Sequence, residues 1–274
     1  MHGTQSRELL KNGELHARVK REKEAHDGRD VLAENIRIKN RFSHIWVYPS
    51  RLRFYDRIES YLADLEGKKV LDYGCGRGER ALRYVSQEMG AAHVTGIDIS
   101  SNYIADADRK MQAADIPKNR FDFHIMDAHQ LDFEDGSFDL IVGFGILHHL
   151  EANVAFSEIH RVLKPDGRIL LQEPLADNPL LRFFHWLTPK ARTKDELPFS
   201  GRAVQELTSR YSWNAELFYC GILEAPVSMV TSVVMPKSPD NWLLRLSDRL
   251  EKWLHRRSIL MNWNQYICFN MKKL

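Results

Sequence analysis

The amino-acid sequence predicts an α/β protein built on a doubly wound, mostly parallel β-sheet. Short apolar segments of strand length alternate with segments of helical periodicity, which is typical of βαβ units. A cluster of glycines joins the first strand to the helix that follows it, and an aspartate stands at the end of each of the first three strands. Ligands of such folds bind at the carboxyl ends of the strands, so these residues predict a binding crevice there.

The core is expected to span residues 67–174. Five strands are predicted at 69–73, 93–99, 121–126, 138–144 and 168–172, and three helices at 77–89, 102–114 and 153–163. The strands are almost continuously apolar, which indicates burial on both faces of the sheet. Turn residues agree with this order, because Asp135 and Gly136 precede the fourth strand and a Pro-Asp-Gly turn at 165–167 precedes the fifth.

Two regions flank the core. Residues 1–66 are expected to form a helical N-terminal lid, in which Trp46, Tyr48 and Tyr55 would cover the bound cofactor. Residues 175–274 begin with a proline-rich cap insertion and continue with a helix, strand material, an amphipathic helix and a final strand at 266–271. We expect this last region to complete the sheet.

The glycine loop has the pattern G-x-G-x-G, with Gly74, Gly76 and Gly78 around Cys75, whereas dinucleotide-binding loops have G-x-G-x-x-G. Asp72 precedes the loop, and its carboxylate would repel a pyrophosphate but attract the ammonium group of an amino acid. The loop therefore favours S-adenosylmethionine over NAD as the cofactor.

The second and third strands end in further carboxylates. Asp98, followed by Ile99, lies 20 residues after Gly78, a separation that suits hydrogen bonding to ribose hydroxyls. Asp127 and Ala128 would offer a carboxylate for the adenine amine and room for its ring. The alternative is that each aspartate caps the next helix, but three of them after a glycine loop favour a ligand site.

Four segments resemble, in order and spacing, the motifs of class I S-adenosylmethionine-dependent methyltransferases. They are VLDYGCGRGER, GIDIS, IMDAHQLDFEDGSFDLIVGFGILHHL and EIHRVLKPDGRILLQEP. The resemblance implies a Rossmann-like sheet of seven strands whose last strand, at 266–271, runs antiparallel. It also implies that S-adenosylmethionine is the cofactor and S-adenosylhomocysteine the product.

The resemblance assigns the remaining cofactor contacts. The three glycines of the loop would approach the methionine portion, and Asp98 would bind the ribose. Their neighbours Asp72, Cys75 and Ile99 are also expected to contact the cofactor. Phe144 and Gly145 would pass close to the sulfonium.

Two residues are candidate catalytic groups. His148 could remove a proton from the acceptor, and Glu173, at the end of the fifth strand, is a second candidate acid or base. The alternatives stay open: displacement at a sulfonium needs only alignment, and Glu173 could position the substrate or cap a helix. No metal site is expected, because the sequence has no HExxH motif or clustered carboxylates.

A small-molecule acceptor is expected, and nucleic acid is not. The segment after the fourth strand reads GFGILHH, where methyltransferases acting on base amines carry an Asn/Asp-Pro-Pro-aromatic motif, and the net charge is only +2. We therefore expect methyl transfer to an oxygen or nitrogen of a secondary metabolite or of a glycan or lipid-linked precursor. The alternatives are carbon methylation of a quinone-like substrate and a scaffold that binds the cofactor without catalysis.

The remaining expectations concern location and partners. Three separated cysteines and a charged N-terminal sequence without a signal peptide predict a cytoplasmic protein. Residues 217–235 are apolar but interrupted by Gly221, Glu224 and Pro226, so they predict a strand, a turn and a second apolar segment rather than a membrane span. Residues 241–257 predict a basic amphipathic helix, which would contact a membrane surface peripherally, close the active site or form a homodimer.

Overall fold

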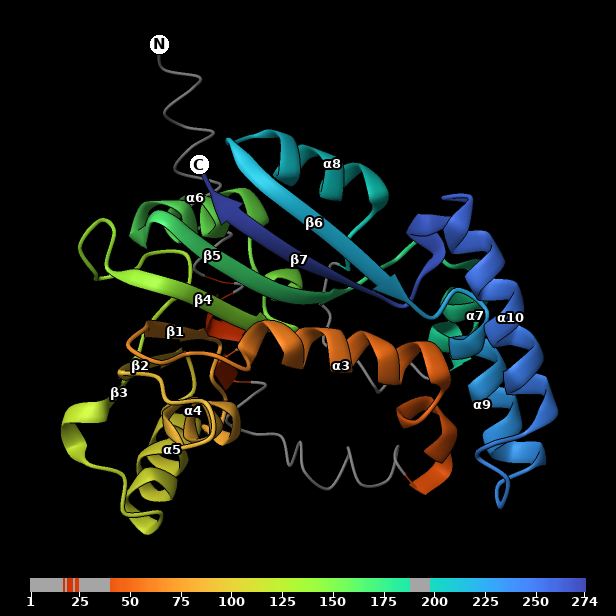
Figure 1. Cartoon of the computed structure of the whole chain (residues 1–274), viewed down its shortest axis with the longest axis horizontal. Helices are drawn as coiled ribbons and strands as arrows, with labels where there is room; N and C mark the ends of the chain where they lie inside the picture. Colours follow the sequence, from red (N-terminus) through yellow and green to blue (C-terminus); the bar gives the residue numbers. More distant parts are fainter. Residues whose placement is uncertain (1–16, 18, 22, 25–39, 188–197) are drawn as a thin grey trace.

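The structure is a computed structural model that describes residues 17, 19–21, 23–24, 40–187 and 198–274 (Figure 1). Its centre is a seven-stranded sheet in the order β3-β2-β1-β4-β5-β7-β6. The first five strands run parallel to one another, and β7 runs antiparallel to both β5 and β6. This confirms the predicted fold class, including the antiparallel final strand. The strands are β1 Lys69–Tyr73, β2 His93–Asp98, β3 Phe121–Ile125, β4 Phe138–Phe144, β5 Leu163–Pro174, β6 Trp213–Cys220 and β7 Tyr266–Lys273.

Helices cover both faces of the sheet, as the apolar strands predict. On one face α3 Pro49–Leu62, α4 Glu79–Val85 and α5 Ser101–Ala113 pack against side chains such as Val70 and Leu170. On the other face α6 Ala152–Val162 and α8 Gly201–Ser209 pack against the alternate side chains, including Leu171. The sheet thus separates two apolar cores.

A third, smaller group of helices lies beyond β6 and β7 (Figure 1). It contains α7 Pro179–Leu187, α9 Glu224–Val234 and α10 Trp242–Arg256, and α9 contacts both of the others as well as the 3-10 turn Ser43–Trp46. The Glu251 carboxylate of α10 accepts hydrogen bonds from the backbone N–H groups of Gly221, Leu223 and Glu224 at 2.8–3.1 Å. These groups lie at the start of α9, so Glu251 ties α10 to the body of the protein.

The segment 217–235 folds as predicted. Its first part is the end of β6, a turn follows at Gly221, and the second apolar part is α9. Within the described ranges, no helix combines the length and apolar character needed to cross a bilayer.

Two predicted boundaries differ from the structure by more than two residues. Helix α4 ends at Val85 rather than at residue 89, because Ser86 adopts an extended conformation and its hydroxyl bonds the carbonyl of Arg83. The Pro-Asp-Gly turn is a bulge inside β5, where the register with β4 shifts and Asp166 takes a φ of 62°. Both differences arise from local hydrogen bonding that hydrophobic periodicity does not encode.

Candidate active site

A cavity of about 190 Å³ opens at the carboxyl ends of β1, β2 and β4. Many predicted cofactor residues line it, namely Gly74, Gly76, Asp98, Ile99, Asp127, Ala128 and Gly145. Residues that the sequence did not single out contribute as well: Val19, Ile97, Tyr103, Met126, His129, Ile146 and Leu150. His149, which the sequence places beside His148 at the rim of the site as a weaker candidate base, also lines the cavity. The other predicted site residues, Asp72, Cys75, Gly78, Phe144, His148 and Glu173, lie outside this lining.

The glycines of the loop after β1 have different roles. All three have positive φ, which side chains rarely allow. A Cβ on Gly76 would meet no atom within 4 Å, so the backbone is open to a ligand there. A Cβ on Gly74 would lie 2.9 Å from Ile146, and one on Gly78 would lie 2.8 Å from Ala107 of α5. Gly78 therefore allows α4 to begin close to α5, while Gly76 leaves space beside the cavity.

Asp98 connects the loop to the cavity. One carboxylate oxygen accepts the Gly76 N–H at 3.0 Å, and the other accepts the Ser100 N–H at 2.9 Å. The N-cap of α5 is Ser100, whose hydroxyl accepts the Tyr103 N–H at 3.3 Å. Asp98 is thus a lining carboxylate and not the cap of the next helix.

Asp72 is buried below the loop instead. It is 3% exposed, and burial raises its pKa to about 7, although the positive charge of Arg80 opposes this shift. A backbone hydrogen bond from Ala81 also acts on its carboxylate. Ala81 lies in the first turn of α4. The alternative that an aspartate caps the following helix therefore describes Asp72 better than it describes Asp98.

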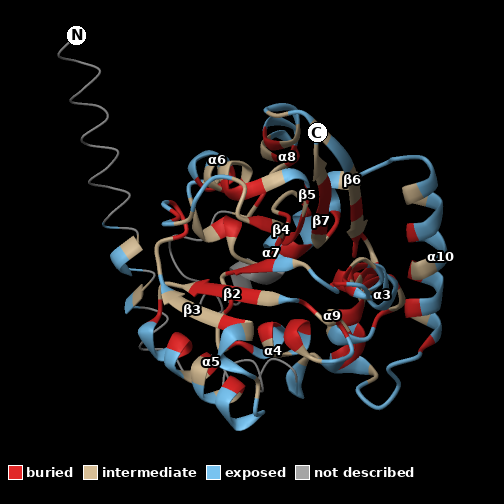
Figure 2. Ribbon diagram, turned by 60° about the vertical axis from the view of Figure 1, so that its left-hand side comes forward, coloured by how far each residue is buried: buried red, intermediate tan, exposed pale blue. Residues whose placement is uncertain are grey.

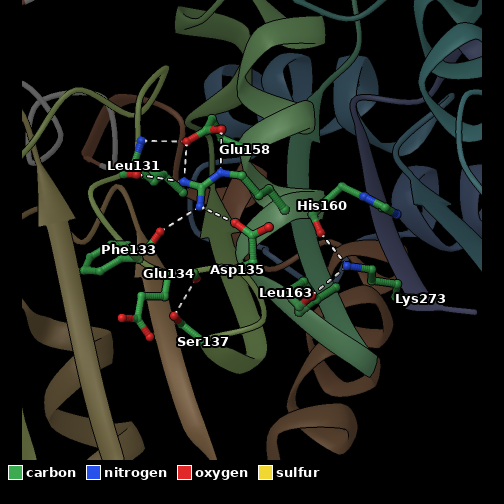
Figure 3. A network of polar contacts seen from close by, with 10 residues as sticks. Leu131, Phe133, Glu134, Asp135, Ser137, Glu158, His160, Leu163 and Lys273 are labelled. Carbon is green, nitrogen blue, oxygen red and sulfur yellow. Dashed lines mark hydrogen bonds and ion pairs between the residues drawn. The ribbon is translucent and has the colours of Figure 1, made fainter.

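The loop that carries Asp127 and Ala128 is held from two sides. The Tyr73 hydroxyl donates to the Ala128 carbonyl. Arg161 of α6 donates to the carbonyls of Leu131 and Phe133 at 2.7–2.8 Å and to Glu158 and Asp135 at 2.8–2.9 Å. Figure 3 shows the acceptors of this network gathered between α6 and the loop. The fixed loop sets the position of the Asp127 carboxylate at the cavity.

Glu173 is fully buried behind the segment that follows β4. Its carboxylate accepts the backbone N–H groups of Ile146, Leu147 and His148 at 3.0, 2.8 and 3.3 Å. It also bonds Nδ1 of His148 at 2.8 Å. This arrangement suits a residue that positions the segment and orients the His148 ring.

The two histidines lie side by side, with ring centroids 4.1 Å apart. His149 lines the cavity, whereas the His148 ring adjoins Gly145, since a Cβ built on that glycine would lie 3.5 Å from His148 Cε1. Phe144 lies under Arg80, whose guanidinium carbon is 3.9 Å from the ring centroid. The GFGILHH segment thus supplies the rim of the cavity.

The described part of the N-terminal region meets the cavity through Val19 and Lys23. Val19 lines it, and the Lys23 ammonium donates to the Ile99 carbonyl at 3.0 Å. The aromatic residues expected to cover the cofactor, Trp46, Tyr48 and Tyr55, are not part of the cavity lining. Tyr48 is fully buried and donates to Gln265 at 2.7 Å. Residues 1–16, 18, 22 and 25–39, which make up half of the predicted lid, fall outside the described residues.

The donor set fits S-adenosylmethionine. An open backbone at Gly76, carboxylates at two neighbouring strand ends and the small residue Ala128 match the ammonium, ribose and adenine parts of this molecule. The residues that the structure describes contain no group of three or more histidines, cysteines, aspartates or glutamates that could hold a metal ion.

Comparisons with known proteins agree with the fold. Residues 70–167 match the model of a family described as a methyltransferase domain. The demethylmenaquinone methyltransferase of Lactococcus lactis subsp. lactis (strain IL1403) is 30% identical over 154 residues, which are 56% of this chain and 59% of that protein. The 27-O-demethylrifamycin SV methyltransferase of Amycolatopsis mediterranei (strain S699) is 35% identical over 120 residues, 43% of each chain.

The chain thus spans about half the length of these curated relatives. Among solved structures, the phosphoethanolamine N-methyltransferase 2 of Haemonchus contortus in complex with S-adenosyl-L-methionine superposes with a TM-score of 0.56 at 19% identity. The superposition covers 85% of this chain and 56% of that one, and it shows a shared fold. Within the α/β core of this chain, residues 70–167 thus match a methyltransferase domain.

Proposed function

We propose that the protein transfers the methyl group of S-adenosylmethionine to an oxygen or nitrogen atom of a small-molecule acceptor by direct displacement. The observation that carries this proposal is the cavity in which Asp98, Asp127 and the open backbone at Gly76 meet at one sheet edge. Two of the similar proteins are named for methylation of an oxygen of a rifamycin and of the nitrogen of phosphoethanolamine. These names support an acceptor of the same class.

When bound, S-adenosylmethionine supplies a methyl group on a positively charged sulfur. An acceptor oxygen or nitrogen that took this methyl group would also have to give up a proton. In the proposed mechanism His148 takes this proton, with Glu173 holding the Nδ1 side of its ring. Gly145 and Ile146 line the cavity next to this ring and would shape the position of the acceptor.

Calorimetry and a methyl-transfer assay would test the proposal. We expect the full chain to bind S-adenosylhomocysteine and to incorporate labelled methyl groups from S-adenosylmethionine into an acceptor from a metabolite extract. Absence of binding would contradict the cofactor assignment. Binding without transfer to any acceptor would favour the alternative of a non-catalytic scaffold.

Carbon methylation is the second candidate, because a demethylmenaquinone methyltransferase is among the similar proteins. The two candidates differ in the labelled product. A methyl group on oxygen or nitrogen and one on carbon give distinct carbon-13 chemical shifts when the transferred methyl is isotopically labelled, so one product spectrum distinguishes them.

We further propose that α10 contacts an anionic membrane surface. Trp242, Leu246, Leu250 and Trp253 are 46–61% exposed and recur at helical spacing, so the apolar side of the helix faces away from the protein (Figure 2). The buried side carries Leu244, Ser247 and Glu251 instead. Exposed basic residues flank the apolar stripe, namely Arg245, Arg249, Lys252, Arg256 and Arg257. A Trp- and Leu-rich stripe beside a row of cations is complementary to acyl chains beneath anionic headgroups.

Vesicle sedimentation would test this contact. We expect the protein to bind vesicles that contain anionic lipid and to lose at least about tenfold in affinity when Arg245 and Arg249 are both replaced by Glu, because each cation contributes about 1 kcal/mol near such a surface. Arg202→Glu, a charge reversal at an exposed arginine of α8, serves as the control. A stable homodimer that buries the stripe and ignores vesicles would contradict the proposal.

All three cysteines, Cys75, Cys220 and Cys268, are buried as free thiols. This state supports a reducing compartment, and we propose the cytoplasm as the location of the protein.

A further inference from the structure

A buried arginine lies on the inner side of α3. Arg51 is only 6% exposed and falls on the same side of the helix as Phe54, Ile58 and Leu62, which pack against the sheet. Arginine is rarely buried to this extent unless an anion pairs with it, because removing its charge from water is costly.

Aromatic rings surround the Arg51 guanidinium. Its carbon lies 4.9 Å from the ring of Trp46, 5.0 Å from that of Tyr55 and 5.1 Å from that of Tyr266. Nη2 donates to the Tyr55 hydroxyl at 3.4 Å. Burial lowers the pKa of Arg51, but the neighbouring phenols of Tyr266 and Tyr55 raise it, and the net change is upward. The group therefore carries a full positive charge.

No carboxylate neutralises this charge within the described part of the chain. The neighbouring arginines of α3 do form ion pairs, Arg53 with Asp248 and Arg57 with Glu216, and both are about half exposed. Among the described residues, Arg51 has phenol and aromatic side chains as its partners. A buried cation with such partners can still pair with an anion.

The site adjoins the cofactor cavity. The Tyr55 hydroxyl donates to Gln172 Oε1 at 3.3 Å, and the Gln172 carbonyl accepts the N–H of Gly145, a cavity-lining residue, at 2.8 Å. Tyr266 is the first residue of β7 and pairs with Pro174 at the carboxyl end of β5. Arg51 therefore lies at the same edge of the sheet as the cavity, on the side of β5 and β7.

A second cation approaches the same region. Arg80, which is exposed, stacks on Phe144 at the end of β4, next to Gly145. Burial raises the pKa of the Tyr55 phenol to about 12, and the positive charge of Arg80 opposes this rise. Two guanidinium groups thus flank Tyr55, one buried and one exposed.

We infer that Arg51, with the hydroxyls of Tyr55 and Tyr266 and with Arg80 at the rim, binds an oxyanion of the methyl acceptor, a phosphate or a carboxylate. This inference rests on the proposed function, since it defines the acceptor of the same site. The planar guanidinium can form two parallel hydrogen bonds to such a group, and the phenols can donate further ones. Held there, the anionic end of the acceptor would direct its other end toward Gly145 and the transferred methyl group.

Binding of inorganic phosphate and of acetate to the full chain saturated with S-adenosylhomocysteine tests the inference. We expect one of the two anions to bind at millimolar concentration, which also distinguishes a phosphate from a carboxylate. Arg51→Met should weaken this binding by roughly 10- to 100-fold, the effect of losing a charged hydrogen-bonding partner. Arg53→Met, two residues along the same helix, is the matched control and should bind like the wild type.

Arg51→Lys and Tyr55→Phe keep the test decisive if Arg51→Met does not fold. Lysine retains the positive charge but lacks the planar guanidinium that can form two parallel hydrogen bonds, so we expect Arg51→Lys to lose less anion affinity than Arg51→Met. Tyr55→Phe removes one hydroxyl donor and should also lower the anion affinity. Wild-type affinity in both variants, or no anion binding to the saturated wild type, would overturn the inference. Because S-adenosylhomocysteine binding is measured first, failure of the anion site is distinguishable from failure of the methyltransferase assignment.

Discussion

Replacement of Asp98 by alanine is expected to weaken the binding of S-adenosylhomocysteine by roughly 100- to 1000-fold. The ribose hydroxyls of the ligand would lose their charged hydrogen bonds to this carboxylate, and each bond contributes about 1.5–3 kcal/mol. The variant also frees the Gly76 N–H that Asp98 holds at 3.0 Å, which removes one link between the glycine loop and β2 and leaves the hydrogen bond from the Cys75 N–H to the Ile97 carbonyl. Isothermal titration calorimetry measures the change directly.

Asp108→Ala is the matched control for this prediction. Asp108 belongs to the adjacent helix α5 and pairs with Lys118 away from the cavity. We expect its cofactor affinity to equal that of the wild type. If Asp98→Ala also retains wild-type affinity, the ribose assignment is wrong and the loop must hold the cofactor by its backbone alone.

Replacement of Glu173 by alanine is expected to lower the free energy of unfolding by about 3–5 kcal/mol, because buried donors lose their acceptor. The N–H groups of Ile146, Leu147 and His148 all donate to this carboxylate, which is fully buried. The segment beside the cavity would lose its anchor, so kcat should fall as well. Chemical denaturation and a methyl-transfer assay give the two values.

Comparison with His148→Ala identifies the role of Glu173. This variant keeps the three backbone hydrogen bonds, so we expect a small loss of stability together with a large loss of kcat if the imidazole accepts the proton. Glu206→Ala, on the surface of α8, controls for the removal of a carboxylate. Full activity of Glu173→Ala in its folded state would refute a positioning role.

The sequence predicts the fold well because the relevant signals are local. Strands β1 and β4 have the predicted bounds, since their apolar residues are bracketed by turn residues on both sides. The sequence also predicts that Gly74, Gly76 and Asp98 meet at one crevice, and these residues do line the cavity. A ligand site between a strand and a helix needs particular residue types at fixed spacing, so its assignment to the cofactor stays a prediction.

Other features depend on contacts between distant segments. Which of His148 and His149 lines the cavity depends on Glu173, 25 residues further on, and adjacent histidines look alike in a sequence. Arg51 is buried because α3 packs against β6, a contact that the sequence does not predict. One sequence signal for its burial was available, since Arg51 lies on the apolar side of an amphipathic helix together with Phe54 and Ile58.

The position of β7 has a consequence for how the protein is made. It lies between β5 and β6 but follows both in the chain, so β6 has no partner strand until β7 has left the ribosome. Until then β5 and β6 each expose a row of unpaired backbone N–H and C=O groups. Such unpaired strand edges promote aggregation of incompletely folded chains. Folding of this sheet therefore finishes only after translation of its last strand, and the half-made protein is the form most in need of a chaperone.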